Sequence, residues 1–530
     1  MASELLIKER LSYFSSEEVI TAELRFKTHR VMPKYLEQDI LSFPPYPDVD
    51  CSDICWNDTT LPRSLARALN GFVFLVTLAK NYLETNDTIG FNRAHLLIKD
   101  FAEQNPAYIV EKGSMVFHDE TTALRASSLI IFLATSLEFS TPAQIEVLCN
   151  EILKTVELLS QEHFFVGNSN HGMFQSVSLL KGALIFNHPE SNNWIALAEK
   201  RLNEYFLSAF TSDGIHNEHS PMYHAVVLRY LDEYINLLKM YDLEIPPQME
   251  ELSAKAHEYP KHYTRHDRKA FLMGDSTIST MINLPMPPNN GKSFTPFENT
   301  GYAFFEDSEL KLNACFSACF QHYYHKHNDD LQFIMYFDGD VLIDAGGPGY
   351  EYENPYVEYG RSYHAHNTLC VDGASFHRRN RDYENVNMTQ TNNTPEYATA
   401  TGYNKRYPDV VHERTVNYFW DNNLFEIIDN VTSDNTHHYC FSWHFDSALN
   451  LEIQTNSINV YRNEKLIATM TITADNDENF IIVEATGQDT PHIQGYRFRV
   501  VTTPEPTPTI EVIFEKCSNV KMTTKIQLFN

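Results

Sequence analysis

The first half of the chain repeats apolar residues at intervals of three and four, the spacing of amphipathic helices. The pattern is strongest in residues 61–84, 121–139, 141–164 and 224–241. Thr141 precedes Pro142 at the start of the third segment, which is typical of a helix N-terminus. Antiparallel pairs of such helices favour an α/α barrel or toroid over a simple bundle, although the pattern alone does not choose between these arrangements.

The second half changes to short runs of β-branched and aromatic residues, which predict strands. Asp-Gly, Asn-Asn and Asp-Asn pairs separate these runs and act as turn signals. The runs are residues 331–337, 341–345, 367–373, 414–420, 424–431, 465–474, 479–486, 496–503 and 509–514. Many short strands in succession indicate an antiparallel β-sandwich.

A stretch rich in Pro, Asn and Gly, residues 283–301, separates the two patterns and is typical of a linker. We therefore predict an α+β multidomain protein. Residues 1–285 form the α/α domain, residues 286–300 the linker, and residues 301–530 the antiparallel β-sandwich domain.

Charge narrows the choice of partners. The 530 residues carry a formal net charge of −29. Nucleic-acid binders usually present a basic face, so we expect no nucleic-acid partner. An acidic polysaccharide would need a locally basic cleft. Residues 261–269 and 377–381 are candidates for one, although such runs more often form solvated surface.

The eight cysteines form no C-x-x-C pair, which argues against a cysteine zinc site and a disulfide framework. The N-terminus lacks the apolar region of a signal peptide. No run approaches the roughly 18 apolar residues of a membrane span. We expect no membrane association, with a cytoplasmic location for the chain as given, or a periplasmic or secreted one if a signal was removed.

Polar and titratable residues concentrate in three places. The first is "GNSNHGMFQ" and the second is "SDGIHNEHSPMYH", where Ser-Pro opens a helix with Tyr223 in its first turn. Both are equally well explained as ordinary polar loops. The third, "QHYYHKHNDDLQF", directly precedes a predicted strand.

His325 and His327 are two residues apart in the third cluster, so on a strand both would point to one face and Lys326 to the other. Such a face could hold a metal ion, or divide its histidines between a metal and proton transfer. The Asp338-Gly339 turn predicts a hairpin that places Asp344 opposite Phe333 rather than His327. A site containing both His327 and Asp344 therefore requires the segment before the strand to curl back.

These stretches, together with "HAHNTLCVDG", resemble the signature of the heparinase II/III-like polysaccharide lyases. The upstream "NHG" and "EHSPMYH" look like motifs of that family's helical domain, and the resemblance runs from about residue 60 to the C-terminal strands. It implies an incomplete α/α toroid followed by an antiparallel β-sandwich. It also implies β-elimination beside the carboxylate of a uronic acid, in a glycosaminoglycan such as heparan sulfate or in a bacterial exopolysaccharide.

The resemblance assigns roles to residues at the matching positions. Asn170 would neutralise the substrate carboxylate, with His171 beside it. Tyr223 would act as the acid and, on one epimer of the uronate, also as the base, while His325 would be the other base. A tyrosine base needs nearby positive charge or hydrogen-bond donors, and Arg125, His219 and His224 are the candidates to supply them and to contact substrate.

The same resemblance implies a structural zinc site in the β-sandwich domain, formed by His327, Asp344 and His366. His364 is the alternative to His366, which is preferred because it directly precedes Asn-Thr. Two features depart from the family pattern. Phe174 stands where some members have Glu, and Lys326 lies between the paired histidines.

Two other functions remain open from the residues alone. A non-catalytic carbohydrate-binding or capsule-assembly protein could keep the same fold. A glycoside hydrolase on an α/α scaffold would need two carboxylates flanking the bond, whereas the clusters here centre on Asn, His and Tyr.

Overall fold

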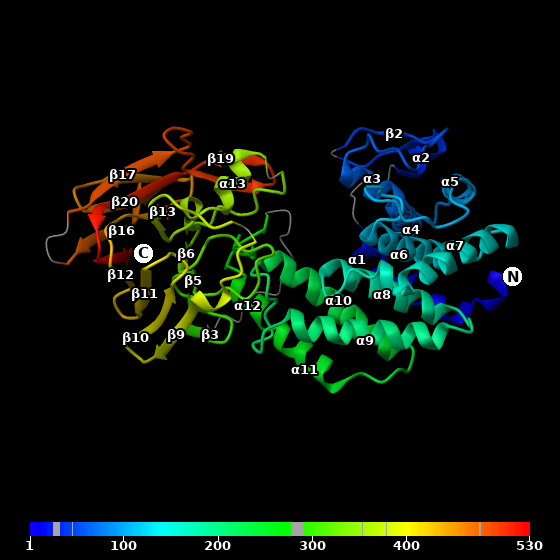
Figure 1. Cartoon of the computed structure of the whole chain (residues 1–530), viewed down its shortest axis with the longest axis horizontal. Coiled ribbons are helices and arrows are strands. Elements are labelled where there is room, and N and C mark those ends of the chain that lie inside the picture. Colours follow the sequence, from blue (N-terminus) through cyan, green and yellow to red (C-terminus); the bar gives the residue numbers. More distant parts are fainter. Residues whose placement is uncertain are drawn as a thin grey trace. The chain divides into compact units, whose positions relative to one another are not determined.

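The computed structural model describes residues 1–24, 32–44, 46–277, 291–351, 353–377, 379–475 and 479–529. They form two compact units (Figure 1). The first unit is Met1–Ser208 with Tyr230–Met249, and the second is Ala209–Arg229 with Glu250–Asn530. Helix α10, Pro221–Met240, contributes residues to both.

The first unit is helical and contains the expected incomplete α/α toroid. Its main helices are α1 Glu17–Glu23, α2 Met32–Glu37, α3 Arg63–Asn70, α4 Val73–Thr85, α5 Phe91–Gln104, α6 Asp119–Ser136, α7 Pro142–Ser160, α8 Asn170–Ile185 and α9 Ser191–Ala209. A short pair of strands, β1 Ile40–Leu41 and β2 Val49–Asp50, lies between α2 and α3.

Local chemistry sets the helix boundaries. The hydroxyl of Thr141 accepts a hydrogen bond from the backbone N–H of Gln144, whose side chain returns to Thr141, so α7 begins with a capping box as Thr141-Pro142 predicted. The single helical segment expected at residues 61–84 is two helices instead. Phe72 adopts φ 54°, a left-handed conformation that ends α3 and redirects the chain into α4.

The second unit begins with helices and continues into antiparallel sheets. Its helices include α11 Pro247–Ala256, α12 Tyr259–Tyr263 and α13 Pro355–Arg361. The strands are β3 Lys292–Phe297, β4 Tyr302–Asp307, β5 Leu312–Ser317, β6 Gln332–Phe337, β7 Asp340–Leu342, β8 Leu369–Val371, β9 Val386–Asn393, β10 Tyr397–Asn404, β11 Val410–Phe419, β12 Leu424–Ser433, β13 His437–His444, β14 Leu449–Ile453, β15 Ser457–Arg462, β16 Lys465–Ala474, β17 Ile481–Thr486, β18 Tyr496–Val500, β19 Thr503–Pro506, β20 Pro508–Cys517 and β21 Val520–Leu528.

Three of the sheets form the β-sandwich predicted from the alternating pattern. Their strand orders are β14-β15-β16-β21-β12-β11-β10-β9, β17-β20-β13-β8 and β3-β4-β5-β6-β7. One apolar cluster joins all three, with Phe333 of β6 packing on Phe425 of β12 at a ring distance of 5.1 Å. β11 and β12 alternate between buried and less buried residues, as expected for strands with one face on the core.

The stretch predicted as a linker is only partly described. Residues 278–290, which contain its first part and the proposed domain boundary, lie outside the described residues. Lys292–Phe297, which we expected to belong to the linker, is strand β3 and pairs with β4 along its length. Its Pro296 is tolerated because β3 is an edge strand.

The stretch that carries His325 and His327 lies before the strand. The sequence predicted a strand from Leu331, and regular pairing in β6 begins at Gln332. His325 and Leu331 both adopt positive φ, 58° and 60°, so the chain between them is a folded loop. The hairpin at Asp338-Gly339 forms between β6 and β7 as predicted.

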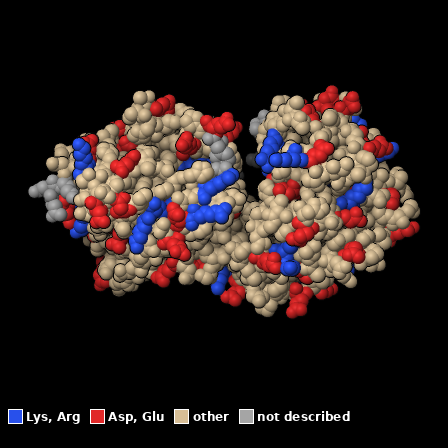
Figure 2. All heavy atoms as spheres, in the orientation of Figure 1, with Lys and Arg blue, Asp and Glu red and all other residues tan. Residues whose placement is uncertain are grey.

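No helix among the described residues is long and apolar enough to cross a membrane. Acidic side chains are spread over the visible faces of both units, with fewer basic ones among them (Figure 2).

Candidate active site and metal centre

The second unit holds a stacked pair formed by Tyr223 and His325. Tyr223 lies in the first turn of α10, as predicted, and His325 lies in the loop before β6. Their rings are nearly parallel, with centroids 3.4 Å apart and planes 12° from each other. A phenol and an imidazole so close together can handle two protons of one reaction.

Asp275 fixes the histidine of this pair. Its Oδ2 accepts a hydrogen bond from His325 Nδ1 at 2.8 Å, and its Oδ1 accepts one from His327 Nε2 at 3.0 Å. Arg361 Nη2 donates to both oxygens, at 2.8 and 3.0 Å. Burial alone would raise the pKa of Asp275, but the hydrogen bonds from the two histidines and the charge of Arg361 hold it well below its ordinary value.

From the sequence we did not identify Asp275, which lies 50 residues before His325 in the chain. The same is true of Tyr350, whose hydroxyl lies 2.9 Å from the hydroxyl of Tyr223 and 3.3 Å from His325 Nδ1. Both contacts depend on tertiary structure. The available sequence signal was a neighbouring glycine: Gly274 precedes Asp275 in "MGDS", and Gly349 precedes Tyr350 in "GGPGY".

Gly274 permits the approach of Asp275 to His325. It adopts φ 54°, and a Cβ atom there would lie 2.6 Å from the backbone oxygen of His325 and 3.0 Å from that of His219. The backbone N–H of Asp275 donates to the same His325 oxygen at 3.1 Å. Only glycine combines this backbone conformation with this clearance.

His219 and His224 do not occupy positions from which they could contact substrate, contrary to our expectation. Both are buried, at 2% and 1% exposure. His219 Nε2 accepts from the backbone N–H of Gln321 at 2.8 Å. His224 Nδ1 accepts from the backbone N–H of His216, while its Nε2 lies 2.9 Å from the backbone oxygen of Ala256.

Burial lowers the pKa of both histidines, to about 4 for His224. Each ring is therefore neutral and bonded to backbone groups on loops that flank the stacked pair. Buried backbone N–H and C=O groups need hydrogen-bond partners, and these two imidazoles provide them. The two histidines therefore hold the segment 216–224 in place.

Arg125, the third predicted substrate contact, lies inside the helical unit with no exposed surface. Its Nη1 donates to the backbone oxygens of Asn70 and Val116, at 3.0 and 2.7 Å. Its guanidinium also lies 4.9 Å from the ring centre of Phe101. A cation held by carbonyls and aromatic faces joins helices together and does not contact a polymer in solution.

Asn170 and His171 open helix α8 in the first unit, after the N-cap Ser169. Tyr205 donates a hydrogen bond to Asn170 Oδ1, which orients the amide. His171 Nδ1 donates to Asp119 Oδ1 at 3.0 Å. Burial alone would lower the pKa of His171, but that hydrogen bond and the charges of Glu120 and Asp119 raise it above its ordinary value. A helix N-terminus with an amide and an imidazole whose raised pKa favours the protonated form suits a carboxylate ligand.

His327, Asp344 and His366 form a buried group whose potential ligand atoms all lie within 4.8 Å of one another. The loop before β6 does curl back, and this brings His327 to Asp344. His366, rather than His364, completes the group. Nδ1 of His327 and Nε2 of His366 are buried without a hydrogen-bond partner among the described residues. Two such nitrogens beside a carboxylate fit a zinc ion.

Asp275 also supports this group, because a metal-binding histidine usually donates its second N–H to a carboxylate. Here the second nitrogen of His327 faces Asp275. The same carboxylate therefore orients one histidine of the stacked pair and one histidine of the candidate metal centre.

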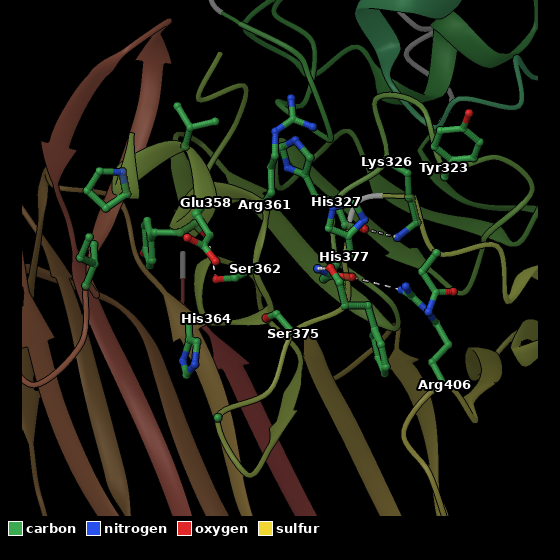
Figure 3. Close-up of a pocket in the computed structure, with 18 of the residues that line it drawn as sticks. Tyr323, Lys326, His327, Glu358, Arg361, Ser362, His364, Ser375, His377 and Arg406 are labelled. Atoms are coloured by element: carbon green, nitrogen blue, oxygen red, sulfur yellow. Dashed lines mark hydrogen bonds between the residues drawn. The ribbon is translucent and has the colours of Figure 1, made fainter. Parts of the chain in front are cut away.

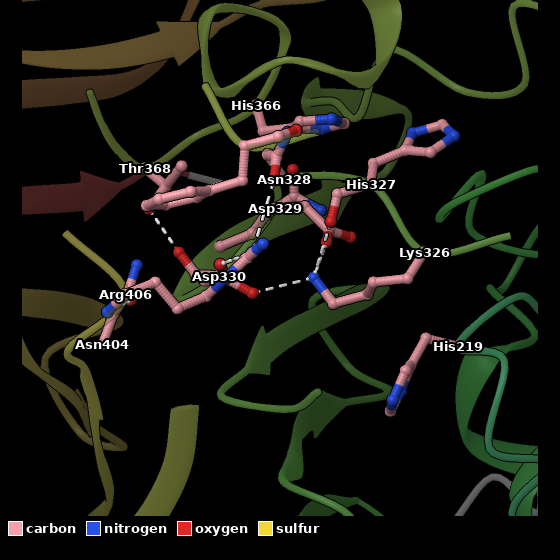
Figure 4. Close-up of polar contacts among 12 residues, drawn as sticks. His219, Lys326, His327, Asn328, Asp329, Asp330, His366, Thr368, Asn404 and Arg406 are labelled. Atoms are coloured by element: carbon pink, nitrogen blue, oxygen red, sulfur yellow. Dashed lines mark hydrogen bonds and ion pairs between the residues drawn. The ribbon is translucent and has the colours of Figure 1, made fainter. Parts of the chain in front are cut away.

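Lys326 has different partners from His325 and His327, as predicted, but this follows from a folded loop and not from strand alternation. Its ammonium is buried and binds the carboxylates of Asp329 and Asp330 (Figure 4). Asp330 also accepts from Arg406 at 2.6 Å and from the hydroxyl of Tyr363 at 2.6 Å. This network holds the loop from its inner side, so Lys326 is a structural residue.

A pocket of about 690 Å³ opens in the second unit beside this loop (Figure 3). Its walls include His327 and Arg361 together with aromatic side chains such as Phe320 and Tyr323. Aromatic faces and hydrogen-bonding groups in one concave surface are typical of a small-molecule or sugar site.

Two family descriptions match the chain. "Heparinase II/III N-terminus" covers residues 15–296, and "Heparinase II/III-like, C-terminal" covers residues 289–526. Comparison with curated proteins gives no match.

Solved structures share the fold over nearly the whole chain. A mutant of heparan sulfate lyase from Pedobacter heparinus is 17% identical, with 98% of this chain and 88% of that chain covered and a TM-score of 0.71. Heparinase III is 14% identical, with 98% and 89% covered and a TM-score of 0.78. Chondroitin AC lyase from Streptomyces coelicolor A3 is 10% identical, with 98% and 82% covered and a TM-score of 0.60.

An α/α toroid with a β-sandwich and a Tyr–His pair defines the class as that of the polysaccharide lyases. The chain belongs to the heparinase II/III-like family, whose two domains match it from residue 15 to residue 526. The resemblance seen in the sequence is confirmed.

Proposed function

We propose that the chain cleaves a uronate-containing polysaccharide or oligosaccharide by β-elimination, with Tyr223 and His325 transferring the protons. The observation that carries this proposal is the stacked pair itself, at 3.4 Å between ring centres. Elimination needs one group to take a proton and another to give one, and both must reach adjacent atoms of the same sugar.

The hydrogen bond with Asp275 supports His325 as the base. Because Nδ1 donates to the carboxylate, the proton of the neutral ring resides on Nδ1 and Nε2 carries the lone pair. In the proposed reaction Nε2 takes the proton at C5 of the uronate. The C4–oxygen bond breaks, a C4–C5 double bond forms, and Tyr223 gives its proton to the leaving oxygen. On the other epimer of the uronate, Tyr223 serves as both base and acid.

Asn170 and His171 have a separate role in this proposal. Removing the C5 proton places negative charge on the uronate carboxyl group, and catalysis requires that charge to be stabilised. The amide and the imidazolium at the start of α8 supply hydrogen bonds and positive charge for it. In this proposal the amide and the imidazole of α8 stabilise charge and do not transfer the protons of the elimination. Asn170→Ala should therefore lower kcat by a factor of about 100 without altering the Tyr223–His325 pair.

We further propose that His327, Asp344 and His366 hold zinc in a structural role. A bound zinc would add rigidity to the loop before β6. Asp275, which hydrogen-bonds to both His327 and His325, holds His325 to this loop. Metal analysis of His327→Ala should show the loss of the zinc bound there, and retained stoichiometric zinc would reject this ligand.

The substrate class follows from the charge of the proposed carboxylate subsite and from the family. Similar structures are named for lyases of heparan sulfate, chondroitin and xanthan. We propose a glycosaminoglycan-like polymer or a bacterial exopolysaccharide as the substrate, without assigning its sulfation.

Ultraviolet absorbance tests the proposal, because the new C4–C5 double bond is conjugated with the carboxylate. The chain is incubated with heparan sulfate, heparin, chondroitin sulfate, hyaluronan, alginate and bacterial exopolysaccharides. We expect absorbance to rise on at least one of them and Tyr223→Phe to abolish the rise. Tyr324→Phe is the matched control, since Tyr324 is an exposed tyrosine one residue from His325.

The other outcomes decide between the alternatives. New reducing ends without the chromophore would indicate a hydrolase and overturn the proposal. Binding of a polymer without any cleavage would indicate a carbohydrate-binding protein. Full activity in Tyr223→Phe would reject the assigned role of this tyrosine.

A further inference from the structure

A second group of metal-ligand side chains lies in the sandwich domain, apart from His327, Asp344 and His366. It comprises His364, His492 and Glu511, whose potential ligand atoms all lie within 4.8 Å of one another. His364 lies in the one-turn helix Tyr363–Ala365, and Glu511 lies on β20. Three segments far apart in the sequence therefore converge on one point.

One imidazole nitrogen of this group lacks a hydrogen-bond partner among the described residues. Nδ1 of His364 is buried and has no hydrogen-bond partner among the described residues. The rings of His364 and His492 have centroids 4.8 Å apart, and His492 Nε2 lies 3.4 Å from Glu511 Oε1. A buried imidazole nitrogen without a partner costs free energy unless something binds it.

Outer hydrogen bonds fix the carboxylate in place. Gln494 Nε2 donates to Glu511 Oε1 at 2.7 Å. The amide oxygen of Gln494 accepts in turn from the hydroxyl of Tyr359 at 3.1 Å and lies 3.2 Å from His444 Nε2. Such second-layer contacts orient ligands in established metal sites.

The group borders the pocket of Figure 3, since both His364 and His492 line it. His492 keeps 40% of its side chain exposed, whereas Glu511 keeps 5%. The carboxylate thus closes the inner side, and the imidazoles face the opening. An ion at this point would have ligands on one side and an open coordination position on the other.

The lysine and arginine side chains that line the pocket already have carboxylate partners. Arg361 binds Asp275, while Lys326 and Arg406 both bind Asp330. An anionic ligand entering the pocket would therefore meet cations that are largely neutralised. A divalent ion would add positive charge where these side chains do not.

We propose that His364, His492 and Glu511 bind a divalent transition-metal cation of the zinc type at the edge of this pocket. Two imidazoles and one carboxylate are the donor set of open zinc sites, whose remaining position takes water or an anionic oxygen. The proposal is independent of the lyase mechanism, because none of the three residues belongs to the catalytic set.

Metal binding in the wild type and in His492→Ala tests the proposal. The full-length chain is stripped with a chelator and dialysed against Zn²⁺ alone, and bound metal is counted at equilibrium. We expect His492→Ala to bind one equivalent less than the wild type. Only the difference between the two chains is used, so metal bound by His327, Asp344 and His366 cancels. Co²⁺ provides a second readout, since its visible absorption at this site should disappear in the variant.

The matched control is His437→Ala. His437 also lies in the sandwich domain beside carboxylates, with Nδ1 2.7 Å from Asp372 and Nε2 3.5 Å from Asp409. Among the described residues it belongs to neither group of potential metal ligands, so this variant should bind as much metal as the wild type. His364→Ala should lose the same equivalent as His492→Ala. Equal metal binding by the wild type and His492→Ala would overturn the proposal, as would an equal loss in His437→Ala.

Discussion

Asp119→Asn should lower the pKa of His171 and with it the positive charge at the start of α8. Asp119 Oδ1 accepts from His171 Nδ1 at 3.0 Å and also lies 2.9 Å from His118 Nδ1. Asparagine keeps the size of the side chain but removes its negative charge. Glu120, 3.6 Å from His171 Nε2, remains and preserves part of the effect.

The size of the expected change in the pKa of His171 follows from its hydrogen bond with Asp119. A hydrogen bond to a charged group contributes about 1.5–3 kcal/mol when buried. The side chain of His171 is 40% exposed, and solvent screening reduces this value. About 1 kcal/mol remains, so the pKa of His171 should fall when Asp119 is replaced.

The sign of the stability change depends on pH. The pKa of His171 is higher in the folded chain than in the unfolded chain, where it is near 6.5. Its contribution to folding stability is therefore fully present below pH 6.5 and is lost as the pH rises through the folded pKa. The pKa of Asp119 is lower in the folded chain than its unfolded value of 3.8. Its contribution to folding stability is therefore present above pH 3.8 and is lost as the pH falls through the folded pKa. Asp119→Asn should therefore destabilise the chain most between about pH 4 and pH 6.5, where both contributions are present.

The assay is a nuclear magnetic resonance titration of ring-labelled histidine, with the His171 signal assigned by its loss in His171→Gln. Glu138→Gln is the control, because Glu138 is exposed just beyond the far end of α6, about 25 Å along the helix. An unchanged or higher His171 pKa in Asp119→Asn would refute the reasoning. So would an equal fall in Glu138→Gln.

Three further substitutions test the loop and the stacked pair. Gly274→Ala should lower kcat by about tenfold or more, because its Cβ would displace His325, the proposed base. Gly113→Ala, also at positive φ but with open space around it, should leave kcat unchanged, and equal kinetics in the two variants would contradict this. Lys326→Met should cost about 3–5 kcal/mol in denaturant unfolding, since it removes the ammonium partner of the buried carboxylate of Asp329, whereas Asp330 keeps Arg406. A loss below about 1 kcal/mol would show that the ammonium is dispensable. Tyr350→Phe should reduce kcat about tenfold with little change in KM, because the variant loses a hydrogen bond to Tyr223 worth about 1.5 kcal/mol. A change confined to KM would instead assign Tyr350 to substrate binding.

Periodic features of the sequence predicted the fold well, because they depend on local burial. The three- and four-residue spacing marked α6, α7 and α10, and the β-branched runs marked β6, β12 and β16. The Asp338-Gly339 hairpin followed from turn chemistry alone. The strand β3 was missed because Pro, Asn and Gly dominate the residues around it, and its pairing with β4 overrides that composition.

Side-chain roles were harder to predict, because they depend on partners distant in the sequence. Arg125, His219 and His224 have the right chemistry for substrate contacts, yet all three are buried with backbone partners. Asp275 and Tyr350 were missed since no spacing rule connects them to His325. The distance between His327 and Asp344 also depended on a loop conformation that strand register could not supply.

The shared carboxylate of Asp275 changes how the H-x-H pair should be searched for in other chains. The two histidines work as a pair only when a third residue, far upstream, bonds to one nitrogen of each. A scan that requires only H-x-H therefore accepts chains in which nothing holds the first histidine in place. A scan that also demands Gly-Asp about 50 residues earlier would select chains able to hold both histidines through one carboxylate.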